Sequence, residues 1–132
     1  MEQHQKNAFA IAKWLQKQLR VQYVLYPGLE NHPGYVINKA QTTSFGGMIS
    51  FAVDNAETAR QILEGVKLIK FAESLGGTES LITYPIRQTH TDLTAEECAE
   101  KGITDCLLRF STGIEATQDL IDDLAQAFAA IE

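Results

Sequence analysis

Hydrophobic residues recur at steps of three and four near both ends of the chain, which is the spacing of an amphipathic helix. The pattern predicts one helix over residues 3–19 and another over 117–131. The apolar stripe of the first consists of Ala8, Ile11, Ala12, Leu15 and Leu19. That of the second consists of Leu120, Ile121, Leu124, Phe128 and Ile131. Each stripe needs an apolar partner surface.

Short runs rich in β-branched and aromatic residues lie between these helices and predict strands. They occupy residues 21–26, 46–53, 68–72, 79–84 and 106–111. Further helices fall between the runs. One begins at Asp54 or Asn55 and is closed by Gly65, and a short one begins with a capping box at Thr94. Another short helix follows Pro33. The order predicts a single α/β (α+β) domain over residues 1–132, with about five strands and helices packed on the sheet.

In the stretch "FAESLGGTESLITYP", residues 71–85, a polar pair and two glycines separate two of these predicted strands. Glycine pairs are favoured where the chain needs positive φ or a close approach. Glu73 and Ser74 could therefore belong to a plain turn, or they could be ligand contacts held at a strand end. Neither interpretation is excluded by the local pattern.

The composition of the chain argues against some classes of function. Apolar residues make up 45% of the chain and charged residues 21%, with a net charge of −6. Scattered basic residues on an acidic chain argue against nucleic-acid binding, and no apolar run approaches membrane-spanning length. Cys98 and Cys106 show no metal-binding or disulfide pattern, which favours reduced thiols and a cytoplasmic location. We expect no metal site.

Arg109 is the charged residue that least fits its surroundings, because it lies inside the apolar run "CLLRFS". It could reach solvent from an edge strand or pair with a carboxylate of the chain. It could also grip a ligand carboxylate or phosphate through two parallel hydrogen bonds. Thr89 and His90 lie in a polar loop that allows either a ligand role or none. No nucleotide fingerprint or nucleophile motif is present, so no catalytic residue is predicted.

Several segments together resemble one enzyme family. "YPGLENHPGYVINKAQ", "SFGGMISF", "ESLGGTESLITYP", "QTH" and "LLRFSTGIE" occur in this order, followed by an acidic amphipathic helix. They are similar to the carboxy-terminal domain of the Cys/Met metabolism (transsulfuration) family of pyridoxal-phosphate (PLP) enzymes. That family includes cystathionine γ-synthase, the cystathionine lyases and methionine γ-lyase. The resemblance implies a mostly antiparallel sheet of four to five strands, the small domain of a fold-type-I enzyme.

The resemblance also implies roles for single residues. Ser74 and Arg109 would hold the α-carboxylate of a sulfur amino-acid substrate. Glu73 would lie near the distal part of that substrate, and Thr89 near the carboxylate. The parent enzyme would use pyridoxal phosphate.

The cofactor-binding large domain of such an enzyme has no counterpart in the sequence, and no lysine stands in the family's Schiff-base setting. The chain alone is therefore expected to be inactive and to bind no cofactor. Its expected partners are that missing domain and a second copy in a homo-oligomer. The alternative function is a non-catalytic remnant that serves as a small-molecule or protein-interaction module. An unrelated α/β binding domain is a third interpretation.

Overall fold

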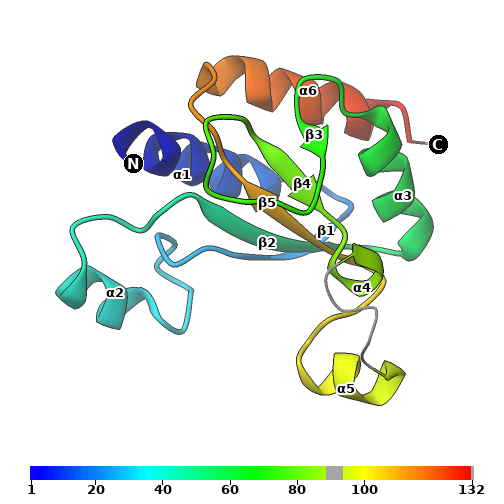
Figure 1. Ribbon diagram of the computed structural model, residues 1–132, viewed down its shortest axis with the longest axis horizontal. Helices are drawn as coiled ribbons and strands as arrows, with labels where there is room; N and C mark the ends of the chain where they lie inside the picture. Colours follow the sequence, from blue (N-terminus) through cyan, green and yellow to red (C-terminus); the bar gives the residue numbers. More distant parts are fainter. Residues whose placement is uncertain (89–93, 132) are drawn as a thin grey trace.

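The computed structural model describes residues 1–88 and 94–131, and they form a five-stranded sheet flanked by helices (Figure 1). The strands stand in the order β1-β2-β5-β4-β3. Their bounds are β1 Val21–Leu25, β2 Met48–Val53, β3 Lys70–Phe71, β4 Leu81–Thr83 and β5 Leu107–Ser111. The helices are α1 Glu2–Gln16, α2 Tyr35–Gln41, α3 Ala56–Gly65, α4 Pro85–Gln88, α5 Ala95–Glu100 and α6 Thr117–Ala129. The predicted mixed fold is confirmed.

Pairing in the sheet is antiparallel except at one edge. β1 with β2, β2 with β5, and β5 with β4 are antiparallel, whereas β3 runs parallel to β4. For two consecutive strands to run parallel, the chain between them must return to the end of the sheet at which the first strand began. Residues 72–80 make that return, and they contain the glycine pair.

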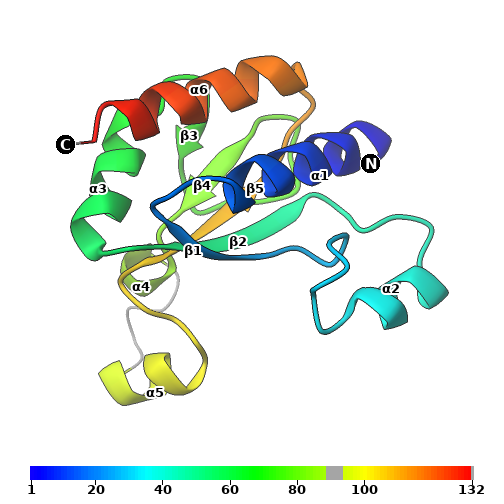
Figure 2. The same ribbon diagram turned by 180° about the vertical axis from the view of Figure 1, so that it is seen from behind.

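One face of the sheet carries the main core. α1, α3 and α6 lie against it, as Figures 1 and 2 show from opposite sides. Alternate residues of the strands point toward these helices, as a period of two requires. The strand residues that are fully buried in this core include Ile49, Phe51, Val53, Ile82, Leu108 and Phe110.

The predicted helix caps are present. The side chain of Asn55 accepts a hydrogen bond from the N–H of Thr58, which begins α3. Thr94 and Glu97 form the reciprocal capping box of α5. Gly102, just beyond that helix, has φ +74°, a conformation that favours glycine at a helix end.

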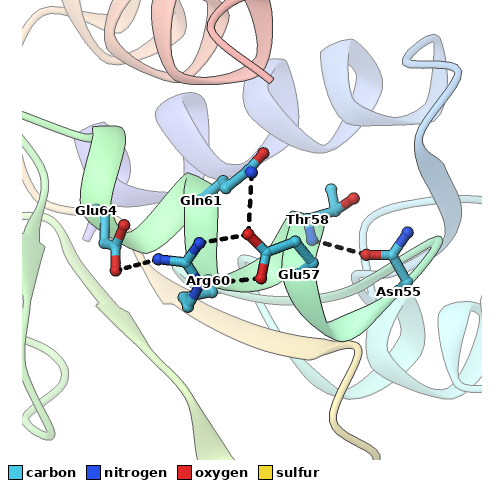
Figure 3. A network of polar contacts seen from close by, with 6 residues as sticks. All are labelled: Asn55, Glu57, Thr58, Arg60, Gln61 and Glu64. Atoms are coloured by element: carbon cyan, nitrogen blue, oxygen red, sulfur yellow. Dashed lines mark hydrogen bonds and ion pairs between the residues drawn. The ribbon is translucent and has the colours of Figure 1, made fainter. Parts of the chain in front are cut away.

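The exposed side of α3 carries a small ionic network, drawn in Figure 3. Arg60 contacts Glu57 and Glu64, one turn away on either side. The hydrogen bond from Arg60 is the main cause that lowers the pKa of Glu57. Such surface pairs add little to stability.

The first helix is shorter than predicted. It ends at Gln16, and Leu19 lies beyond it, fully exposed, so Leu19 is no part of the buried stripe. Trp14 packs edge-on against Phe128 of α6, with ring centroids 5.5 Å apart, whereas Phe9 stays 40% exposed. The four-residue helix α4 was not predicted, because it is too short to show a period. No helix in the described residues is long and apolar enough to span a membrane.

Candidate functional site

Arg109 lies at the middle of β5, on the sheet face opposite α1, α3 and α6. Its flanking residues Leu108 and Phe110 point into the main core, so its own side chain points the other way. Across the sheet its Cα partners are Ser50 on β2 and Thr83 on β4. Arg109 is therefore on an interior strand, which excludes the edge-strand interpretation.

Arg109 is partly buried, yet it has no carboxylate partner in the part of the chain that the structure describes. Every ion pair found there involves Arg20 or Arg60 instead. Holding a cation partly out of water without a partner is unfavourable. The arrangement thus leaves a planar fork of donors available to an anionic ligand or to another protein surface.

Residues 72–76, here called the arch, are fastened beside Arg109 at both ends. The hydroxyl of Thr83 donates to the carbonyl of Ala72 at 2.7 Å. The N–H of Gly76 donates to the hydroxyl of Ser111 at 2.9 Å. Thr83 is the cross-strand neighbour of Arg109, and Ser111 lies two residues further along the same strand. Ser74 lies midway between the two ends of the arch, each of which is bonded to a strand neighbour of Arg109.

The first glycine of the pair has a definite structural cause. Gly76 has φ +74°, which lets the arch turn back toward β4. The adjoining carbonyl of Gly77 lies 3.0 Å from the imidazole Nε2 of His4 in α1. The turn is thus both a backbone requirement and part of a fixed scaffold, while Glu73 and Ser74 keep exposed side chains.

Behind the arch, residues 78–80 lie against the turn 113–115 that follows β5. Buried Ser80 donates to Glu115 from its N–H and its hydroxyl, each at 2.7 Å, and it accepts from the N–H of Gly113 at 2.8 Å. Buried Asn7 of α1 donates to the carbonyls of Gly113 and Glu115. Sequence reasoning missed these residues. The only signal was "STGIE" directly after an apolar strand.

The structure thus brings three of the four sequence-predicted site residues to one region. Arg109 on β5 carries a charged fork, and Ser74 and Glu73, both exposed, are neighbours in the sequence of the arch. Thr89 lies outside the described residues. A guanidinium and a hydroxyl are both groups that bind a carboxylate, the guanidinium through charge-assisted hydrogen bonds.

Covalent attachment of an aldehyde cofactor does not fit this chain. A Schiff-base lysine is activated by desolvation or by a nearby cation, whereas all seven lysines here are exposed. The described residues contain no group of three His, Cys, Asp or Glu side chains that could hold a metal ion. Burial raises the pKa of the Cys106 thiol, which makes that thiol a weaker nucleophile at neutral pH.

A hollow of about 610 Å³ lies elsewhere, between α1, the turn at 28–31 and α2. Phe9, Tyr35 and Phe45 contribute its aromatic walls. Its lining includes neither Arg109 nor any residue of the arch, so it is separate from the candidate site.

Sequence comparison identifies the family to which this chain belongs. The family described as "Cys/Met metabolism PLP-dependent enzyme" matches residues 1–129. The chain belongs to this family. A cystathionine gamma-lyase of Dictyostelium discoideum is 50% identical over 128 residues, covering 96% of this chain and 33% of that protein. A cystathionine gamma-synthase of Haemophilus influenzae is 48% identical, covering 100% of this chain and 31% of that protein.

Solved structures agree with the sequence match. A cystathionine gamma synthase of Xanthomonas oryzae pv. oryzae, in complex with aminoacrylate and cysteine, superimposes with a TM-score of 0.91 at 43% identity. The match covers 99% of this chain and 35% of that one. MetB of Corynebacterium glutamicum gives a TM-score of 0.93 at 40% identity, covering 100% and 34%. The chain therefore spans about a third of the length of the relatives that it matches.

Proposed function

We propose that this chain supplies the α-carboxylate clamp of a PLP-dependent enzyme of sulfur amino-acid metabolism, of the cystathionine γ-synthase or cystathionine/methionine lyase type. In this proposal it acts as the carboxy-terminal substrate-binding domain, and another part of the enzyme holds the cofactor. One observation carries the proposal. Arg109 is a partly buried cation with no ion-pair partner in the described residues, on the sheet face opposite α1, α3 and α6, and its strand neighbours Thr83 and Ser111 bond to the arch that carries Ser74.

Each residue has a chemical role in this clamp. The guanidinium of Arg109 binds both carboxylate oxygens in parallel, which fixes the orientation of the amino acid. The hydroxyl of Ser74 donates a further hydrogen bond. Glu73 faces the distal part of the substrate, and Thr89 lies near the carboxylate. The clamp orients the substrate, and proton transfer at its α-carbon is left to groups outside this chain.

A hybrid enzyme tests the proposal. The matching third of the cystathionine gamma-lyase of Bacillus subtilis, which is 46% identical, is replaced by this chain, and cleavage of L-cystathionine is assayed. Arg109→Ala should lower kcat/KM through a higher KM, by about 2–4 kcal/mol or roughly 30- to 1,000-fold. Ser74→Ala should act in the same direction and less strongly.

Two matched variants separate loss of the carboxylate clamp from the mere loss of a charge and from a change elsewhere in the loop. Arg60→Ala removes an exposed arginine from α3, and Thr78→Ala removes an exposed hydroxyl from the same loop as Ser74. Neither should change KM by more than about twofold. A folded, cofactor-loaded hybrid that is inactive before any substitution would favour a non-catalytic interaction module. Unchanged KM in Arg109→Ala would remove the carboxylate clamp from the proposal.

A further inference from the structure

The arch that carries Ser74 has little support of its own. Residues 73–79 are all exposed, so no buried side chain of this segment fixes its path. Exposed segments with few packed contacts open easily. Something else must hold the arch if Ser74 is to keep one position relative to Arg109.

Two buried hydroxyls provide that support. Thr83 is 1% exposed and Ser111 is 3% exposed, and both extend from the same sheet face as Arg109. Thr83 fastens the carbonyl of Ala72, two residues before Ser74, and Ser111 fastens the N–H of Gly76, two residues after it. The two anchors are thus symmetric about Ser74 and adjacent to Arg109.

We propose that Thr83 and Ser111 are positioning residues for substrate binding. Their hydroxyls hold the two ends of the arch, so that Ser74 and the Arg109 fork converge before the substrate arrives. This inference rests on the proposed function and extends it to residues that do not touch the substrate. Preorganised groups lose less conformational entropy on binding, so the effect belongs in KM rather than in kcat.

Hydrogen exchange on the full 132-residue chain tests the hydrogen bonds without any activity. In Ser111→Ala the amide of Gly76 should exchange at least about tenfold faster, because the hydroxyl that accepts its hydrogen bond is gone. Thr112→Val is the matched control, since buried Thr112 is the next residue and its hydroxyl contacts the carbonyls of His4 and Gly47 instead. That control should leave Gly76 unchanged. Unchanged exchange in Ser111→Ala would overturn the anchor.

Kinetics of the hybrid enzyme test the positioning. Ser111→Ala and Thr83→Val should each raise KM for L-cystathionine about five- to thirtyfold with kcat within about twofold. Thr83→Ser keeps the hydroxyl and should restore KM, which a purely packing role would not predict. Thr112→Val should lower stability without this KM effect. Unchanged KM in Thr83→Val, or no rescue by serine, would overturn the proposal even if Ser111→Ala failed to fold.

The two levels of the proposal fail differently. If Arg109→Ala raises KM but neither hydroxyl variant does, the clamp stands and the positioning role is wrong. If Arg109→Ala itself leaves KM unchanged, the proposed function is wrong and the positioning role falls with it. The hydrogen-exchange result then reports only a structural hydrogen bond.

Discussion

Glu115 accepts two hydrogen bonds from Ser80, one from its backbone N–H and one from its hydroxyl, each 2.7 Å long. Ser80 is fully buried, so these donors have no access to water. The pair joins the end of the arch-containing loop to the turn before α6, and it does so from behind the candidate site. Its first consequence is for stability rather than for substrate.

Glu115→Ala should therefore lower the free energy of unfolding by about 2–4 kcal/mol, because it leaves two buried donors of Ser80 unsatisfied. Urea denaturation measures this change. Glu79→Ala is the matched control, since Glu79 is exposed and lies beside Ser80. Equal midpoints for the two variants would show that the pair contributes nothing.

Gly113 lies close against the backbone of residues 78–79. A Cβ atom built there would stand 2.3 Å from the carbonyl oxygen of Thr78, which is backbone and cannot move aside alone. Gly113→Ala should cost at least about 2–4 kcal/mol of unfolding free energy, through steric overlap and loss of the hydrogen bond to Ser80.

Gly77→Ala is the comparison for that substitution. A Cβ at Gly77 meets no atom nearer than 4.0 Å, and its φ is not positive. It should change stability by less than about 1 kcal/mol. A Gly113→Ala variant as stable as Gly77→Ala would contradict the close approach.

The sequence predicted most elements because their periodic patterns and caps are local. Asn55 and Thr94 cap their helices as the residues indicate, and the apolar run around Arg109 is an interior strand. What could not be predicted is long-range. Asn7 and Ser80 look like ordinary polar residues, and only the folded chain brings them to the turn 113–115. The hydroxyls of Thr83 and Ser111 are hidden in the same way, because a strand pattern does not show which loop crosses its face.

Tyr26 makes the stability of the folded chain fall as the pH becomes strongly alkaline. Burial raises the pKa of Tyr26 from 10.0 to about 12, and its hydroxyl donates to the carbonyl of Gly46. Between these two values the unfolded chain releases the proton and the folded chain keeps it. Stability from this group is therefore complete below pH 10 and is lost as the pH rises toward 12.

Urea unfolding at about pH 8 and about pH 11 tests this in paired variants. Tyr26→Phe has no proton to lose, so it should lose less stability between the two pH values than the unsubstituted chain. Tyr23→Phe, at an exposed tyrosine on β1, should behave like the unsubstituted chain. Identical pH slopes in all three would contradict the assignment.

Asp123 fastens the segment after α3 to α6. Its two carboxylate oxygens accept from the N–H groups of Lys67, Leu68 and Ile69 at 2.8–2.9 Å, and the side chain is only 6% exposed. An asparagine has one oxygen and presents an NH₂ group where the second acceptor stood. Asp123→Asn should therefore leave at least one buried N–H unsatisfied and cost about 1–3 kcal/mol of unfolding free energy.

The neighbouring residue supplies a control with the same change of charge. Asp122 is exposed and contacts Gln118 within the same helix, so Asp122→Asn should stay within about 0.5 kcal/mol of the unsubstituted chain. Hydrogen exchange localises the effect, because the amides of Lys67, Leu68 and Ile69 should lose protection in Asp123→Asn and keep it in Asp122→Asn. Loss of stability with full protection at these three amides would mean that the cost arises in α6 itself. In that case the carboxylate would not be what fastens residues 67–69 to α6.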